Sequence, residues 1–306
     1  MKKNTKPVIL CLSASIVFAV FIVLGCVAKN FRIPSEIDLS KSRMLVEPPP
    51  PLSGSITIKV VTFNIWDLFP MGTSRAERMQ AIGRKLVELK PDIIGFQEAF
   101  YDGDRKILLD QLKAAGLVHS QYFRSGFMGS GLLVVSRFQI EEAFFRRFSA
   151  KGKFYKVWHG DWWAGKGIGL VRVKLPGNKG YLDFFNTHVH AGYGNDEYQN
   201  VILSNLKECA VFINETSTKT SPAICTGDFN SRIGSIPNTA FVQDAKLLRL
   251  MAIDSAIDHI WGQENPGYGF KVLETVPIQG TVDVGGKARK LSDHSGFMST
   301  ILVFSK

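Results

Sequence analysis

Five short polar motifs, each at the end of an apolar run, constrain this chain more than any other feature. They are Thr62-Phe63-Asn64, Phe96-Gln97-Glu98, Asn186-Thr187-His188, Gly227-Asp228-Phe229-Asn230 and Ser292-Asp293-His294. Strand ends can hold carboxylates, amides and imidazoles rigidly around one point. A divalent cation and a phosphate ester under attack by water require such an arrangement. The motifs therefore favour hydrolysis of a phosphodiester.

The chain is long enough for one catalytic domain with an N-terminal extension. It has 306 residues, 45% of them hydrophobic, and single-domain enzymes with sheets commonly reach about 200–250 residues. We predict a signal or anchor at residues 1–29, a proline-rich tether at 30–55 and a catalytic phosphodiesterase domain at 56–306. The formal net charge of +10 favours anionic partners, including phosphates, nucleic acids and acidic membranes, without choosing among them.

The N-terminal segment has the pattern of an export signal or a short membrane anchor. Three lysines, Lys2, Lys3 and Lys6, precede an uncharged apolar stretch at residues 8–24. Positive charge before such a stretch tends to stay inside, which sends the rest of the chain across the membrane. Val23-Leu24-Gly25-Cys26 resembles a bacterial lipoprotein cleavage box. We expect a lipoprotein or an N-terminally anchored protein with its catalytic domain outside the cytoplasm, and secretion is the alternative.

The remaining pattern alternates strands and helices. Apolar runs predict strands at residues 56–63, 92–96, 132–136, 139–145, 168–175, 181–188, 223–226 and 296–304. Helical spacing predicts helices at 76–89, 107–115 and 201–213. The sum indicates two packed sheets with helices outside, not a doubly wound parallel sheet. Cys209 and Cys225 read as buried small hydrophobes, and a bridge between them has no positive support.

Glu98 and Asn64 are candidate ligands of a hard cation. Burying an unpaired carboxylate at the end of an apolar strand is costly unless a cation or several donors meet it, and magnesium prefers oxygen ligands. The alternative is a solvated glutamate at the rim and an asparagine that only makes a turn.

Asp228 and Asn230 are two residues apart, so an extended segment projects both side chains to the same side. His188 and His190 also share a face, but no HExxH motif accompanies them. Asp293 and His294 are the most suggestive pair, because an oriented imidazole can take a proton from water near neutral pH. Each motif alone also fits an ordinary turn, and their joint occurrence raises the odds of a site.

The order of the motifs resembles that of the endonuclease/exonuclease/phosphatase superfamily from about residue 56 to the last strand. Three longer strings resemble the neutral sphingomyelinases more specifically. They are YFRSGFMGSG at residues 122–131, HGDWWAGK at 159–166 and NTHVHA at 186–191.

The resemblance implies a four-layer α/β/β/α sandwich, an α/β fold like that of DNase I, with two mainly antiparallel sheets. It also implies magnesium-dependent cleavage of sphingomyelin to ceramide and phosphocholine, with manganese as a substitute. The expected partner is sphingomyelin or a related phospholipid in a membrane, without nucleic acid, and the expected state is a monomer.

Site roles carried over by the resemblance are as follows. Glu98 would bind the catalytic magnesium with help from Asn64, and Lys166 would help to arrange the substrate phosphate. His294, oriented by its neighbour Asp293, would activate the attacking water. The residues expected to hold the phosphate or a second metal are His188, Asp228 and Asn230.

A loop with adjacent tryptophans adds a membrane argument. Asp161, Trp162 and Trp163 are expected to contact substrate or membrane, because tryptophan favours the lipid–water interface. Core packing is the more common use of such a pair. The stretch Ala256-Ile257-Asp258-His259 departs from the Arg-Ile-Asp-Tyr of many relatives, which leaves headgroup preference open. Alternatives are a nuclease, a phosphoinositide phosphatase and a non-enzymatic surface lipoprotein.

Overall fold

The computed structural model describes residues 49–68, 72–153, 155–156, 161–194, 196–218 and 220–306. The predicted signal or anchor and all of the predicted tether before residue 49 lie outside them. Within the described residues, no helix is long and apolar enough to cross a membrane. Leu52, near the end of the predicted tether, is buried in the core, and its amide donates to the carbonyl of Thr220 at 3.3 Å. The last residues before the first strand therefore pack against the domain.

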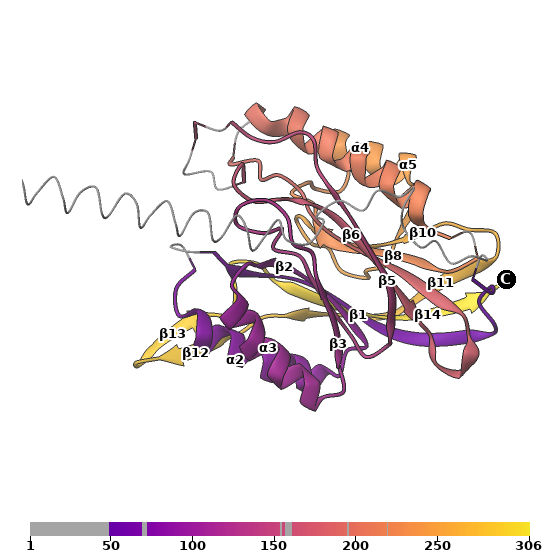
Figure 1. Ribbon diagram of the computed structural model, residues 1–306, viewed down its shortest axis with the longest axis horizontal. Coiled ribbons are helices and arrows are strands. Elements are labelled where there is room, and N and C mark those ends of the chain that lie inside the picture. Colours follow the sequence, from indigo (N-terminus) through magenta and orange to yellow (C-terminus); the bar gives the residue numbers. More distant parts are fainter. Residues whose placement is uncertain (1–48, 69–71, 154, 157–160, 195, 219) are drawn as a thin grey trace, which may run out of the picture.

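Two six-stranded sheets face each other (Figure 1). The first has the order β11-β14-β1-β2-β4-β3, and the second has the order β5-β6-β7-β8-β10-β9. Strands of the first sheet are β1 (Ser55–Asp67), β2 (Ile93–Ala99), β3 (His119–Tyr122), β4 (Leu133–Ser136), β11 (Tyr268–Ile278) and β14 (Gly296–Ser305). Those of the second are β5 (Ile140–Arg147), β6 (Gly167–Lys174), β7 (Tyr181–His188), β8 (Ala223–Asp228), β9 (Leu247–Arg249) and β10 (Asp258–Gln263).

Helices cover the outer face of each sheet. On one side lie α2 (Arg75–Leu89) and α3 (Asp102–Ala114), and on the other α4 (Gln199–Thr216) and α5 (Ile236–Asp244) (Figure 1). Single 3₁₀ turns occur at Pro176–Asn178 and Asp196–Tyr198. A small hairpin of β12 (Thr281–Val284) and β13 (Lys287–Lys290) projects beside α2 (Figure 1). The predicted α/β/β/α sandwich is confirmed.

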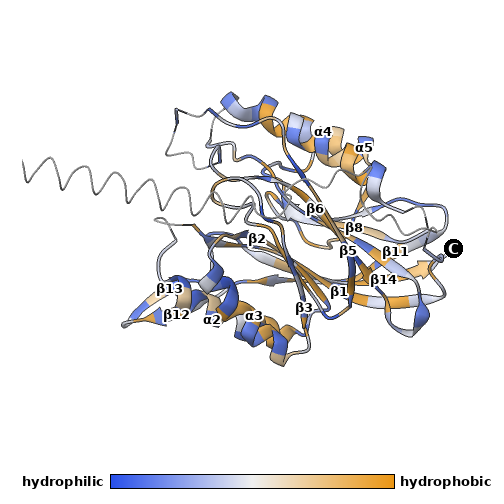
Figure 2. Cartoon of the chain, in the orientation of Figure 1, coloured by the Kyte–Doolittle hydropathy of each residue, from blue (hydrophilic) through white to orange (hydrophobic). Residues whose placement is uncertain are grey.

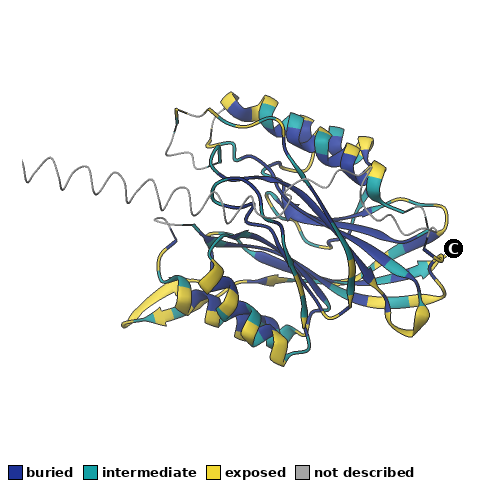
Figure 3. Ribbon diagram, in the orientation of Figure 1, coloured by how far each residue is buried: buried dark blue, intermediate teal, exposed yellow. Residues whose placement is uncertain are grey.

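Three apolar clusters hold the four layers together. One fills the space between the sheets, and each of the other two lies between a sheet and its helices. Hydrophobic residues, orange in Figure 2, lie along the inner strands and on the inward faces of the helices. The same strands are dark blue, the colour of buried residues, in Figure 3. Phe145 packs in the central cluster, whereas Phe144 and Phe148 pack under α4. Cys209 and Cys225 are both buried and free.

A polar contact crosses the apolar interface between the sheets. The Nε2 of Gln97 on β2 donates to the Oδ1 of Asn186 on β7 at 2.7 Å, and the Nδ2 of Asn186 donates back to the carbonyl of Phe96 at 2.9 Å. All three residues are fully buried. These bonds fix the position of the Asn186 amide against Gly95, the residue of β2 that lies beneath it.

Replacing Gly95 by alanine is expected to lower the free energy of unfolding by about 1–3 kcal/mol, because a tightly packed interior cannot absorb an added methyl. The new Cβ would meet Oγ1 of Thr226 and lie 2.8 Å from Oδ1 of Asn186, whose hydrogen bonds prevent it from moving aside. Gly103→Ala in α3 is the matched control, since its Cβ would meet nothing within 4 Å. Urea titration should show the control as neutral or stabilised, and equal midpoints for the two variants would contradict the packing argument.

Candidate active site

Parallel pairing brings the functional strand ends to one edge of the sandwich. In the first sheet β1 runs parallel to β2, and in the second β7 runs parallel to β8. The carboxyl ends of both pairs therefore meet where the two sheets face each other. His188 and Asp228, the last residues of β7 and β8, are direct register partners.

Asn64 joins the two sheets at this edge. Its Nδ2 donates to Oε1 of Glu98 at 3.1 Å and to Oδ2 of Asp228 at 3.0 Å. Glu98 adopts a left-handed φ of 55°, and Asn230 has a φ of 45°. Such conformations cost free energy for residues other than glycine and cluster at functional sites. The hydrogen bonds of Asn64 bring the amide and the two carboxylates, which were predicted from separate motifs, into direct contact.

The two carboxylates are poorly solvated and close to further acids. Burial raises the pKa of Glu98 to about 7, although the hydrogen bond from Asn64 opposes the rise. Burial, followed by the charge of Asp258, raises the pKa of Asp228 to about 6. A positive charge placed between them would stabilise their ionised forms.

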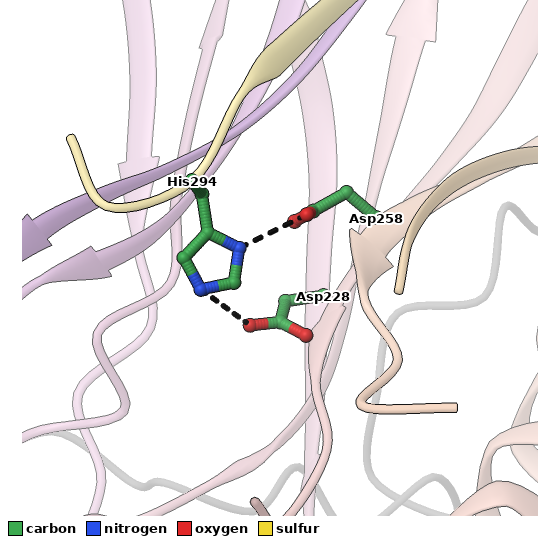
Figure 4. Close-up of side chains that lie close together, drawn as sticks. All are labelled: Asp228, Asp258 and His294. Carbon is green, nitrogen blue, oxygen red and sulfur yellow. Dashed lines mark hydrogen bonds and ion pairs between the residues drawn. The ribbon is translucent and has the colours of Figure 1, made fainter. Parts of the chain in front are cut away.

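His294 lies between two carboxylates of the second sheet, as Figure 4 shows. Its Nδ1 is 2.9 Å from Oδ2 of Asp258, and its Nε2 is 3.7 Å from Oδ2 of Asp228. Burial alone would lower the pKa of His294, but the hydrogen bond to Asp258 and the charge of Asp228 outweigh it and raise the pKa to about 10.

The expectation that Asp293 orients His294 is wrong about the partner. Asp293 is exposed, and its Oδ1 accepts a hydrogen bond from Oγ of Ser292 at 3.3 Å. Asp258 orients the imidazole instead, because β10 pairs with β8 and places Asp258 directly opposite Asp228. The only sequence feature that pointed to Asp258 was its position in the stretch Ala256-Ile257-Asp258-His259, and this position alone does not indicate a role for the residue.

Lys166 lies on the other side of the centre, just before β6. Its Nζ is 2.7 Å from Oδ1 of Asp161 and 3.0 Å from Nε2 of His188, and it donates to the carbonyl of Val189 at 2.9 Å. A lysine ammonium can only donate, so Nε2 of His188 accepts and the ring is neutral. Burial, together with the charge of Lys166, lowers the pKa of His188 well below its usual value.

Asn230 continues the site beyond β8. Its backbone amide donates to Oδ1 of Asp228 at 3.0 Å, and its Nδ2 donates to the carbonyl of Val189 at 3.0 Å. Lys166 and Asn230 therefore donate to the same acceptor, the carbonyl of Val189. The Nε2 of His188 lies 3.5 Å from Oδ2 of Asp228. The structure brings every predicted site residue except Asp293 and the tryptophans into this network of contacts.

The loop that carries Trp162 and Trp163 packs against residues 122–131, another of the three strings that resemble the neutral sphingomyelinases. The amide of Gly165 donates to the carbonyl of Gly129 at 2.9 Å, which joins residues 122–131 to the loop. The rings of Trp162 and Trp163 meet edge to face, with centroids 4.7 Å apart, and both are half-buried. His159 and Gly160 lie outside the described residues. Contact of this loop with a membrane stays a prediction.

The site fits a hard cation. Oε2 of Glu98 is buried and has no hydrogen-bond partner among the described residues. A buried acceptor without a donor costs free energy, which a cation ligated by that oxygen would relieve. A second group, Asp228, Asp258 and His294, offers ligand atoms that all lie within 4.8 Å of one another. In that group the imidazole already bonds Asp258, so the oxygen-rich position at Glu98 suits magnesium better.

Comparison with known proteins matches the chain to a family and to named relatives. The Endonuclease/Exonuclease/phosphatase family matches residues 61–294. Sphingomyelin phosphodiesterase 2 of Rattus norvegicus is 34% identical over 178 residues, which cover 58% of this chain and 42% of the relative. The inositol phosphosphingolipids phospholipase C of Schizosaccharomyces pombe is 33% identical over 185 residues, covering 59% of this chain and 43% of the relative.

Solved structures share the fold. A variant of the beta toxin of Staphylococcus aureus with bound magnesium ions has a TM-score of 0.60 at 18% identity. The alignment covers 82% of this chain and 100% of the toxin chain. The chain spans less than half the length of the curated relatives named above, with matches to 42% and 43% of them.

Proposed function

The chain belongs to the endonuclease/exonuclease/phosphatase family, and from this premise we propose that it is a magnesium-dependent phosphodiesterase of the phospholipase C type. Its proposed substrate is sphingomyelin or a related sphingophospholipid, which it hydrolyses to ceramide and a phosphorylated headgroup. The relatives support this choice, because they are named for sphingomyelin and for inositol phosphosphingolipids.

One observation carries the proposal: groups from distant parts of the chain converge on one small polar centre. Asn64 bonds both Glu98 and Asp228, and Asp228 also faces Nε2 of His294. Carboxylates, an amide, an imidazole and the ammonium of Lys166 together provide cation ligands, phosphate contacts and a proton acceptor.

Each side chain has a proposed task. Glu98, with Asn64 against its Oε1, holds the cation through its free Oε2. Magnesium, when bound, offsets negative charge on the phosphate oxygens. Lys166 and Asn230 contact the phosphate, because both are donors fixed by the carbonyl of Val189 at the edge of the centre. Preorganised donors of this kind stabilise the charge that develops in the transition state.

His294 is the proposed proton acceptor for the attacking water. Asp258 occupies its Nδ1 and so leaves Nε2 to face the centre. Only the neutral imidazole accepts a proton, so the pKa has to fall from about 10 toward neutrality when the site is loaded. Positive charge added beside Glu98 and Asp228 has this effect, because it offsets the carboxylates that now stabilise the imidazolium.

We further propose that the protein works outside the cytoplasm at a membrane surface. The apolar stretch at residues 8–24 with its preceding lysines supports this location, and an anchor would raise the local concentration of enzyme at a lipid substrate.

A substrate panel tests the proposal. We expect the purified full-length protein in detergent to release the headgroup phosphate from sphingomyelin with magnesium and to stop when EDTA is added, because the buried carboxylate set needs its cation. Phosphatidylcholine, lysolipids and duplex DNA serve as comparisons, and restoring magnesium should restore the rate. Cleavage of DNA without hydrolysis of any sphingolipid would instead favour the nuclease alternative.

A further inference from the structure

A cavity of about 420 Å³ opens beside Asn230. Its polar lining comes from Gln199, Asn230, Ser231, Arg232 and Ser235, and the ring of Tyr193 forms an aromatic wall. Arg232 is exposed, and in the described ranges it has no carboxylate partner. None of these groups except Asn230 has a task in the proposed hydrolysis.

The cavity adjoins the proposed catalytic centre through two of its lining residues. Asn230 forms one wall and bonds Asp228 through its backbone amide. Tyr193 forms another and hydrogen-bonds Asp161, which is the ion-pair partner of Lys166. A phosphate held between Lys166 and Asn230 therefore has this cavity next to it.

The lining is too polar for a ceramide and suits a headgroup. Amide, hydroxyl and guanidinium groups dominate it, and the described residues that line it include no carboxylate. A trimethylammonium group cannot form hydrogen bonds, and it prefers several aromatic faces or an anion. Among the described lining residues it would meet one tyrosine ring and the positive charge of Arg232. The hydroxyls of a polyol, by contrast, match each of these donors and acceptors.

We propose that this cavity receives the headgroup of the substrate and that Arg232 selects a phosphorylated polyol over phosphocholine. The inference rests on the proposed function and names the substrate class within it. Arg232 is a specificity residue that hydrogen-bonds the polyol hydroxyls, and sphingomyelin remains a slower substrate.

Hydrolysis in neutral detergent micelles tests this selection without a contribution from surface charge. The wild-type protein is compared on ceramide carrying phosphoinositol and on sphingomyelin. In Arg232→Ala the ratio of the two kcat/KM values, inositol over choline, is expected to fall about tenfold, as for the loss of one charged hydrogen bond. Arg232→Lys should recover part of the ratio.

Arg84→Ala is the matched control, since it removes an equal charge from an exposed position on α2. It should keep the wild-type ratio. An unchanged ratio in Arg232→Ala, with both lipids still hydrolysed, would overturn the inference and leave the proposed function standing.

Calorimetric titration with soluble inositol 1-phosphate and phosphocholine separates the two proposals. A protein that hydrolyses neither lipid but binds inositol phosphate, and loses this binding in Arg232→Ala, would retain the cavity assignment and refute the enzyme. A protein that neither hydrolyses these lipids nor binds either phosphate would refute both.

Discussion

His294→Ala is expected to lower kcat on the sphingolipid substrate by about 10²–10⁴-fold, the usual contribution of a positioned proton acceptor. The fold should survive, because the side chain stands at the mouth of the site with 18% of its surface exposed. Initial rates of headgroup release measure the loss, and thermal unfolding checks the fold. Near-normal turnover by a folded variant would assign the proton transfer to another group.

Asp258→Asn provides the control for that result. Asp258 is a positioning residue, which acts on the reaction through Nδ1 of His294. Asp258→Asn alone should lower kcat. In a protein that already carries His294→Ala it should cause little further loss of kcat, because the two changes remove the same function. Additive losses would mean that Asp258 has a separate role.

Glu98→Gln is expected to weaken magnesium binding by more than about 100-fold, since loss of even an outer-shell partner costs 10–100-fold in metal affinity. The amide keeps the shape of the side chain and can still accept the bond from Asn64. Magnesium titration followed by calorimetry and by activity measures the change. Glu88→Gln, an exposed glutamate on α2, is the matched control. Unchanged magnesium affinity in Glu98→Gln would contradict the assignment.

The same variant should have an opposite effect on metal-free stability. Burial raises the folded-state pKa of Glu98 to about 7 from 4.5, so the wild-type fold loses stability as pH rises through this window. At pH 8 Glu98→Gln removes a buried charge and should raise the free energy of unfolding by on the order of 1–3 kcal/mol without magnesium. Added magnesium should stabilise the wild type far more than the variant.

The sequence located most of the strands, because each is a local apolar pattern, but β1, β2 and β8 continue past their predicted ends at residues 63, 96 and 226 to Asp67, Ala99 and Asp228. The strand at residues 181–188 coincides with β7, and the predicted helix at 76–89 differs from α2 by one residue. Asn64, Glu98 and Asp228 meet because β1 pairs with β2 in parallel register and the two sheets face each other. The local pattern located each residue, but it did not indicate this pairing.

The partner of His294 could not be found in this way. Asp293 is its neighbour in sequence, whereas Asp258 reaches it only through the antiparallel pairing of β10 with β8. The strands β3 and β9 to β13 and the helix α5 are also not among the elements that the sequence predicts. In β11 exposed and half-buried residues separate its buried ends, so it lacks the continuous apolar run of a central strand.

The position of β14 in the first sheet governs when the catalytic centre can assemble during synthesis. β14 lies between β11 and β1 and pairs Thr62 with Phe297, a partner made more than two hundred residues later. Contacts this distant form slowly, and His294 lies two residues before the strand that makes them. The proposed site therefore cannot be complete in a growing polypeptide until β14 has docked, which would separate synthesis from the proposed hydrolysis in time.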